Sequence, residues 1–300
     1  MKRILLGVVT FASMVGTSAF AADLPLKAPP LPVAVYNWTG FYVGGNVGYS
    51  WGHSSTTTEF YNTANGALLS TDARGFNMDG AIGGVQAGYN WQKDKWVFGI
   101  EADIQASGQR GDGLYSCGGG ALTPRAALNS LCAPGHVGDT VPFDVAAFPV
   151  GDALSQKLQW FGTLRGRIGP TITPRVLLYV TGGLAYGEVK TYETVAGVNI
   201  TGQNGTNNST STPVAAAFGS TSTRVGWTAG GGIEGAIGGN WTAKLEYLYM
   251  DLGTLSASFV TPVVTPTGTL LGIRYSSHIT DNILRVGVNY RFGGPVVASY

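Results

Sequence analysis

The segment that decides the fold, residues 96–106, reads Trp96-Val97-Phe98-Gly99-Ile100-Glu101-Ala102-Asp103-Ile104-Gln105-Ala106. Every second residue from Trp96 onward is apolar, whereas the two charged residues, Glu101 and Asp103, occupy the alternate positions. Successive side chains of a β-strand point to opposite faces. The segment therefore predicts a strand with one apolar face and one charged face.

The same alternation recurs along the rest of the chain. Each recurrence places apolar residues or glycines at every second position, and the fourth such apolar set begins at Leu158. The predicted strands are residues 41–51, 81–91, 96–106, 158–168, 176–186, 225–237, 241–249 and 284–292. No apolar set contains a charge. The charged residues of these strands all lie on the opposite face: Glu101, Asp103, Arg165, Arg167, Glu234, Lys244, Glu246, Arg285 and Arg291.

The alternation alone does not say which face is buried, because a soluble β-sandwich also alternates. A sandwich would place its charges outside and its aromatic residues in the core. The composition favours the opposite arrangement, with the apolar face outside and the charged face inside. Only 12% of the residues are charged, against roughly 25% in an average soluble domain. After the N-terminal segment no apolar run is long enough for a membrane-spanning helix, so a closed barrel is the remaining membrane structure. A charge facing lipid at mid-depth costs roughly 2 to 4 kcal/mol, so the charged face is expected to line the interior.

The N-terminus predicts export from the cytoplasm. Lys2 and Arg3 precede an apolar stretch, residues 4–16, and Ala-Phe-Ala at residues 19–21 fits a signal-peptidase site. We expect cleavage after residue 21, with a buried core helix as the alternative. The predicted organisation is a signal peptide (1–21), a proline-rich periplasmic leader (22–36), the barrel (37–292) and a short tail (293–300).

Aromatic residues and connection lengths set the expected orientation. Aromatic girdles of a membrane barrel belong at strand ends, and the residues predicted to form them are Trp51, Trp91, Trp96, Trp241 and Tyr290. The connections 92–95, 170–175 and 238–240 are short, whereas 52–80, 107–157, 187–224 and 250–283 are long. Outer-membrane barrels alternate in this way. The predicted fold class is all-β: an eight-stranded antiparallel transmembrane β-barrel with short periplasmic turns and long extracellular loops, located in the cell outer membrane.

The first and last strands resemble those of a known family. Residues 36–52 read YNWTGFYVGGNVGYSWG, and the last strand ends Val288-Asn289-Tyr290-Arg291-Phe292. With the signal peptide and leader, these motifs resemble the small major outer-membrane proteins of alphaproteobacteria, the RopB type of the OmpA-like eight-stranded barrel superfamily, often labelled porin-family proteins. The resemblance covers essentially the whole chain. It implies that Tyr290 and Phe292 are the assembly signal read by the outer-membrane insertion machinery, although residues 293–300 follow and Tyr300 is an alternative terminal aromatic residue.

Two cysteines, Cys117 and Cys132, lie in the longest predicted connection. The periplasm is oxidising, so the sequence predicts a disulfide between them. No histidine or further cysteine is spaced to complete a metal site, and no cofactor is expected. The net charge of +1 gives no field that would attract nucleic acid.

The interior of an eight-stranded barrel has room for little more than its own side chains. We expect the nine charges to form an ion-pair and hydrogen-bond network that fills the lumen. This favours a structural, surface-exposed role in envelope integrity, without enzymatic activity. The expected partners are outer-membrane lipid and lipopolysaccharide, the insertion machinery, and host or surface ligands that contact the loops. The alternative is a narrow diffusion channel, lined by Arg165, Arg167 and Arg285 opposite Glu101 and Asp103.

A third hypothesis is a lipid-modifying enzyme at the rim. Closure of the barrel makes the first and last strands neighbours. A histidine, a hydroxyl and a carboxylate could then meet at the outer end of these strands, as in a nucleophilic triad. The candidate residues are His53, Ser54, Ser55, His278 and Asp281.

Overall fold

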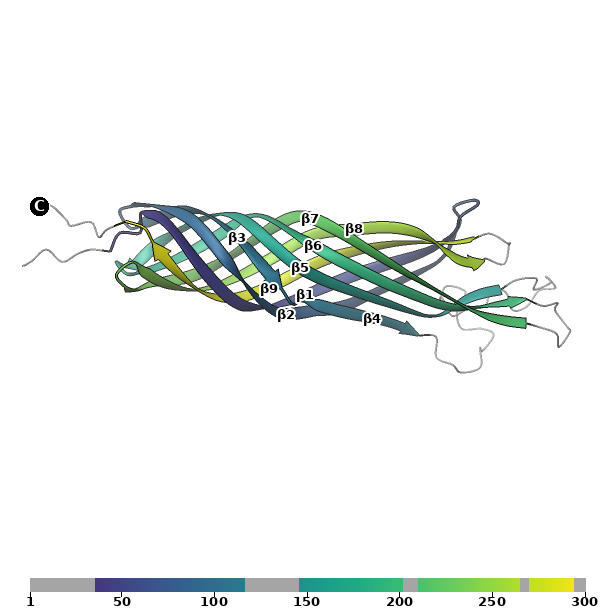
Figure 1. Ribbon diagram of the computed structural model, residues 1–300. Coiled ribbons are helices and arrows are strands. Elements are labelled where there is room, and N and C mark those ends of the chain that lie inside the picture. The colour runs from purple at the N-terminus through teal and green to yellow at the C-terminus, as the bar shows by residue number, and fades with distance from the viewer. Residues whose placement is uncertain (1–35, 117–145, 202–209, 265–269, 294–300) are drawn as a thin grey trace, which may run out of the picture.

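The described part of the chain is built almost wholly of β-strands (Figure 1). The computed structural model describes residues 36–116, 146–201, 210–264 and 270–293. The strands in these ranges are β1 (Gly40–Asn62), β2 (Leu68–Lys93), β3 (Trp96–Ser107), β4 (Arg110–Ser116), β5 (Ala146–Thr173), β6 (Val176–Thr201), β7 (Thr210–Gly238), β8 (Trp241–Val264) and β9 (Leu270–Arg291). No helix in these ranges has the length and apolar character needed to cross a bilayer.

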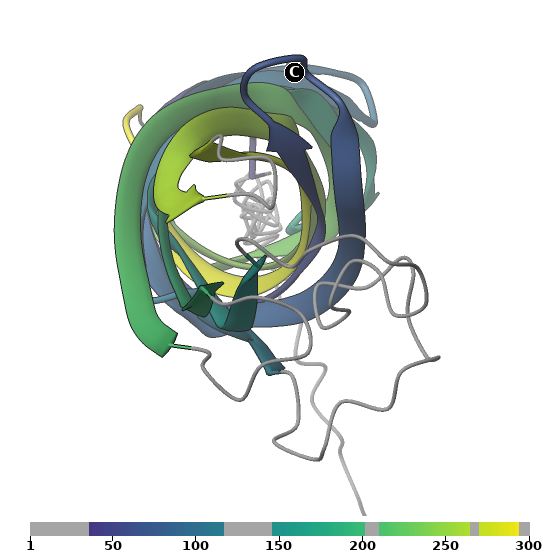
Figure 2. The same ribbon diagram turned by 90° about the vertical axis from the view of Figure 1, so that its right-hand side faces the viewer.

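The strands close into a ring, which Figure 2 shows end-on. Neighbouring strands are antiparallel, and β1 pairs with both β2 and β9, which joins the two ends of the sheet. β3 and β4 occupy one position between β2 and β5, because each of them pairs with both of these strands. They are separated at Gly108 and Gln109, where the Gly108 N–H donates to the Ala81 carbonyl at 2.9 Å. The ring thus has eight strand positions, which confirms the predicted barrel.

Three tight turns define one end of the barrel, called here the turn end. They consist of residues 94–95, 174–175 and 239–240, inside the short connections predicted from the sequence. Asp94 and Gly239 have φ angles of 55° and 51°, the left-handed conformation that such turns require. The start of β1 and the end of β9 lie at the same end (Figure 1), and the opposite end is called the hairpin end.

Between the two ends, the outer wall carries the apolar sets. Val47, Val85 and Val180 are 61%, 61% and 62% exposed, whereas all nine charged residues predicted to face inward are buried. One expected outward residue is wrong: Leu158 is buried in the interior. The β5–β6 register shifts between Leu158 and Trp160. The extra residue of such a bulge reverses the face of the residues beyond it.

The strands continue well beyond their predicted ends. β1 reaches Asn62 rather than residue 51, and β8 reaches Val264 rather than residue 249. Much of each long connection is therefore a hairpin extension of the barrel wall. The face pattern inverts in these extensions: on β9, Ile279 and Ile283 are buried inside while His278 is exposed outside. Apolar inside and polar outside is the pattern of a sheet surrounded by water.

The hairpin end divides into two sheets that diverge on the right of Figure 1. The β7–β8 ladder ends at Trp227 and Asp251, and β2 pairs with β4 only at Asp79 and Arg110. Beyond these points β4-β5-β6-β7 forms one sheet and β8-β9-β1-β2 the other. The seam between β7 and β8 is the more open one, because the inward side chains of residues 216–226 are only half-buried.

Candidate functional site

The lumen is the candidate site, and three layers of side chains fill it. The first layer, at the turn end, is centred on Trp38, which precedes β1 and is 1% exposed. Trp38 packs against Val97 and Leu177. Its backbone N–H donates to Gln92 Oε1 at 2.8 Å, and its indole Nε1–H donates to the Pro174 carbonyl at 3.3 Å. The segment before the first strand is thus folded back into the mouth of the barrel.

The second layer is an ion-pair cluster centred on Glu101 of β3. Lys244 Nζ lies 3.0 Å from both carboxylate oxygens of Glu101. Arg165 donates to Glu101 Oε1. Arg167 and Arg285 place guanidinium nitrogens 3.7 Å and 3.6 Å from Glu101 oxygens. Four cations from β5, β8 and β9 therefore converge on one buried carboxylate.

Three further carboxylates balance the positive charge of this cluster. Arg285 Nη2 lies 2.6 Å from Glu246 Oε2 and 2.9 Å from Asp103 Oδ2. Arg167 Nη1 lies 2.9 Å from Glu234 Oε2. The side chains in these pairs are at most 3% exposed. Buried charges are tolerated only when paired, and here four cations and four carboxylates give a formally neutral layer.

Two tyrosines that the sequence analysis missed hold this layer in place. The Arg167 guanidinium lies 4.7 Å from the centre of the Tyr42 ring and 5.3 Å from that of Tyr179. Tyr42 donates to Glu101 Oε2 at 2.7 Å, and Tyr179 donates to Glu246 Oε1 at 2.8 Å. Both tyrosines occupy the inward parity of their strands. That parity, already used for the charges, was the signal that could have found them.

Arg291 stands apart from the other eight charges. It forms none of the ion pairs found within the described residues. Its Nη1 instead donates to the Thr39 carbonyl at 3.1 Å, and its guanidinium lies 5.0 Å over the Tyr36 ring. Burial raises the pKa of the Tyr36 phenol, while the Arg291 charge acts in the opposite direction. Arg291 thus belongs to the interior through a hydrogen bond and a ring contact and not through an ion pair, and it lies at the mouth of the barrel with Trp38.

The third layer is an apolar core in the half of the barrel nearer the hairpin end, and the sequence analysis missed it. It is assembled from inward residues of β2, β5, β6, β8 and β9, among them Met78, Ile82, Leu154, Leu158, Phe161, Val189, Leu248, Met250, Leu252, Ile279 and Ile283. All are at most 4% exposed. The inverted alternation beyond the predicted strand ends was the signal for it.

The outer wall has aromatic residues at two levels. Trp91, Trp96 and Trp241 are about half exposed at the turn end, and Trp51 is similarly exposed at the opposite level. Tyr290 lies beside Trp241, with ring centroids 5.0 Å apart. On β1 the two levels are marked by Phe41 and Trp51, which are ten residues apart. This separation corresponds to about 25 Å along the barrel axis at a strand tilt of about 40°. That height matches the apolar band of an outer-membrane barrel.

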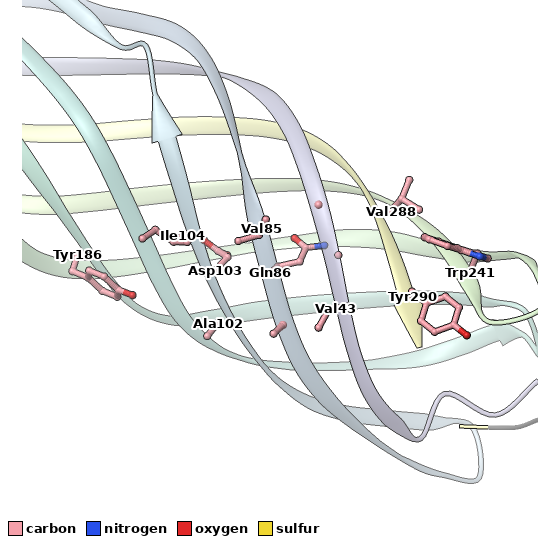
Figure 3. Close-up of a pocket in the computed structure, with 13 residues that line it drawn as sticks. Val43, Val85, Gln86, Ala102, Asp103, Ile104, Tyr186, Trp241, Val288 and Tyr290 are labelled. Carbon is pink, nitrogen blue, oxygen red and sulfur yellow. The ribbon is translucent and has the colours of Figure 1, made fainter. Parts of the chain in front are cut away.

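A shallow groove of about 940 Å³ crosses this wall (Figure 3). Its apolar lining includes Gly45, Ala87 and Ala102, and it extends from Tyr186 to Trp241. Gly45 and Ala102 lie on the outward parity and are exposed. The groove therefore faces the surroundings of the barrel, and the three lumen layers lie on the other side of the wall.

The remaining predicted residues have different outcomes. Phe292 is 49% exposed on the outer wall and its ring stacks on Phe41 at 5.7 Å. Cys117 and Cys132 lie outside the described residues, as do the predicted signal peptide and most of the leader. No group of three or more potential metal-binding side chains occurs within the described ranges.

The rim constellation is assembled only in part. Ser55 and His278 are direct cross-strand partners and are exposed on the outer wall, as is His53, whereas Ser54 and Asp281 are buried inside. Alternation separates the predicted carboxylate, Asp281, from the exposed histidines. His53 Nδ1 instead lies 3.1 Å from an Asn77 oxygen. His278 Nε2 lies 3.4 Å from Asp251 Oδ2, and its Nδ1 lies 3.2 Å from the Thr254 hydroxyl.

A closed ring of eight strand positions, apolar outside and charged inside, with aromatic residues at two levels, defines an outer-membrane β-barrel. Residues 8–292 match the model of the outer membrane protein beta-barrel domain, and the chain belongs to this family. It is 36% identical to the 31 kDa outer-membrane immunogenic protein of Brucella melitensis, over 97% of this chain and 100% of that protein. The 25 kDa outer-membrane immunogenic protein of Brucella canis is 27% identical, over 92% and 91% of the two chains. The 22 kDa outer membrane protein of Rhizobium leguminosarum is 28% identical, over 75% and 68%.

The family assigns the location of the chain. It is an outer-membrane protein, so the turn end is periplasmic and the hairpin end extracellular. The relatives named above are described as outer-membrane proteins, and none of their names describes an enzyme.

Proposed function

We propose that this chain is a structural, surface-exposed barrel with a closed lumen that contributes to envelope integrity. The observation that carries the proposal is the continuous filling of the lumen by the Trp38 layer, the ion-pair layer and the apolar core. An aqueous channel needs solvated side chains along its whole length. The eight charged side chains of the ion-pair layer are almost fully buried and neutralise one another. This argues against a pore lined by Arg165, Arg167 and Arg285.

The proposed partners follow from the two surfaces that remain available. The apolar outer wall contacts outer-membrane lipid, and its extracellular boundary contacts lipopolysaccharide. The extracellular hairpins and the connections between them contact host or surface ligands. The names of the Brucella relatives, which describe them as immunogenic, support exposure at the cell surface. Tyr290, half-buried, and Phe292, exposed, present the assembly signal to the insertion machinery at the periplasmic end.

Single-channel recording in planar bilayers tests the closed lumen. We expect no stable conductance steps from the refolded protein, with a wide porin as the positive control. Trp38→Ala should remain closed as well, because the ion-pair layer and the apolar core are left in place. Stable steps from the parent protein would favour the diffusion channel. Steps from Trp38→Ala alone would show that a single layer closes the lumen and would contradict the three-layer account.

The envelope role and the absence of enzymatic activity need separate measurements in cells. Loss of the protein should increase the sensitivity of the cells to detergents, and the intact gene should restore resistance. Overexpression should leave the composition of lipid A unchanged, since the predicted carboxylate, Asp281, is buried inside the barrel, whereas both histidines are exposed on the outer wall. Altered lipid A would instead support the rim enzyme.

A further inference from the structure

Three cations form a lateral row on the extracellular outer wall. Arg110 of β4 is the direct cross-strand partner of Lys157 on β5, and Lys157 is the direct partner of Lys190 on β6. All three residues are exposed. Directly opposed side chains in a sheet lie about 5 Å apart at Cβ, and like charges in such pairs destabilise the sheet. The row therefore destabilises the isolated protein, and an anionic partner would offset the repulsion between the three cations.

Three carboxylates lie near the row. Asp79 is the cross-strand partner of Arg110, but it accepts a hydrogen bond from the Tyr49 hydroxyl at 2.5 Å. Asp112 and Glu188 lie two residues from Arg110 and Lys190 along their own strands. None of the three cations takes part in an ion pair within the described residues. Their positive charge remains available at the outer wall.

The height of the row selects the partner. Tyr186 and Trp160, whose ring centroids are 6.1 Å apart, mark the outer aromatic level on this side of the barrel. Lys190 lies four residues beyond Tyr186, which corresponds to about 13 Å along the strand and about 10 Å along the membrane normal. The headgroup layer extends about 5 to 8 Å beyond the hydrocarbon core, and a lysine side chain can bend back toward it. The row therefore faces the headgroups of the outer leaflet.

We propose that Arg110, Lys157 and Lys190 form a binding site for the phosphate groups of a phosphorylated glycolipid, the lipid A portion of lipopolysaccharide. The acyl chains would lie on the apolar wall below the row, and the phosphates would bind between the three cations. The inference rests on the lipid contact proposed above and names the residues that make it.

Binding of lipid A to the full protein in detergent, measured by native mass spectrometry, tests this site. Arg110→Gln/Lys157→Gln/Lys190→Gln should weaken binding of bisphosphorylated lipid A at low salt by about tenfold or more, since each cation near an anionic lipid surface contributes appreciably. Added salt should reduce the difference. Dephosphorylated lipid A should bind the parent protein as weakly as bisphosphorylated lipid A binds the triple variant.

A matched control removes the same charge from the other end of the barrel. Lys93, Lys95 and Arg175 are exposed at the periplasmic turns, and Lys93→Gln/Lys95→Gln/Arg175→Gln should bind lipid A like the parent. Equal binding by the two triple variants would overturn the site, as would indifference to the lipid phosphates. Both variants should keep heat-modifiable migration and a closed lumen in bilayers. Loss of lipid binding with the lumen still closed, or the reverse, therefore separates the two proposals.

Discussion

At the scale of single residues, Glu101 is the side chain on which the ion-pair cluster depends most. Its carboxylate is buried and lies within ion-pair distance of four cations, and it also accepts a hydrogen bond from Tyr42. Removing one partner from a buried ionic network leaves uncompensated charge in a medium of low polarity. The neutrality of the layer therefore depends on this side chain more than on any pairwise contact.

Glu101→Gln should lower the free energy of unfolding by about 3 to 5 kcal/mol, because four cations would then face three carboxylates. The measurement is the urea midpoint of the refolded protein in detergent, followed by loss of heat-modifiable migration. Glu59→Gln is the matched control, since Glu59 also pairs with an arginine, Arg274, but at a site where the two side chains are 38% and 58% exposed. The control should change stability by less than about 1 kcal/mol. Equal effects of the two substitutions would contradict a buried, mutually dependent cluster.

Individual residues also show where prediction from the sequence succeeds and fails. The inward position of Glu101 follows from parity, because a charge facing lipid is costly. Leu158 was assigned to the wrong face, because it shares the parity of Trp160 and no residue type marks the intervening bulge. Trp38 lies before the first strand, so no periodic pattern could place it in the lumen. Contacts across the closed barrel, such as Tyr42 with Arg167, depend on the diameter and register of the whole ring.

At the scale of strands, the extracellular edges are the least supported elements. Between residues 215 and 226, β7 pairs with β6 but not with β8, whereas residues 228–235 pair on both sides. The rings of Phe218 and Phe259 lie 3.8 Å apart across the open seam. One aromatic contact replaces a ladder of hydrogen bonds there, so local opening should need little free energy.

Hydrogen exchange measured on the folded protein should reveal this difference within one strand. Amides of residues 217–226 should exchange at least about tenfold faster than those of residues 228–235, because an edge strand opens without breaking pairs on its second side. Residues 280–289 of β9, paired with β1 and β8, serve as the protected reference. Uniform protection along β7 would show that the seam is closed in solution.

The strand ends illustrate why the predicted lengths were short. The sequence analysis followed strands only while the apolar residues kept one parity. At Asn282 the apolar residues of β9 change from one face to the other. Ile279 and Ile283 point inward, whereas Leu284 and Val286 point outward. The physical reason is a change of solvent from lipid to water, since the strand itself is continuous. The point at which the apolar residues change face can be found in the sequence, and it predicts the level at which the barrel leaves the membrane.

At the scale of the whole molecule, the barrel combines two kinds of interior. Its periplasmic half has a charged, paired interior inside an apolar wall, and its extracellular half has an apolar core inside a polar wall. Each half places apolar surface where its own surroundings favour it. The arrangement predicts a fixed depth in the membrane, because a shift along the membrane normal would expose the apolar wall to water or bury the polar hairpins in lipid.

Site-specific labelling with a membrane-impermeant maleimide on intact cells tests this depth together with the orientation, in which the hairpin end is extracellular. Ser256 is exposed on the outer wall of the β8 extension, and Lys95 is exposed in a turn at the other end. Ser256→Cys should be labelled on intact cells, whereas Lys95→Cys should be labelled only after the outer membrane is permeabilised. The parent protein, treated in parallel, gives the background from Cys117 and Cys132. Labelling of Lys95→Cys on intact cells would reverse the orientation, and protection of Ser256→Cys would place the extension inside the membrane. Either result would contradict the assignment of the parity change to the outer surface, since that assignment requires water on the hairpin side of Asn282 and lipid on the other.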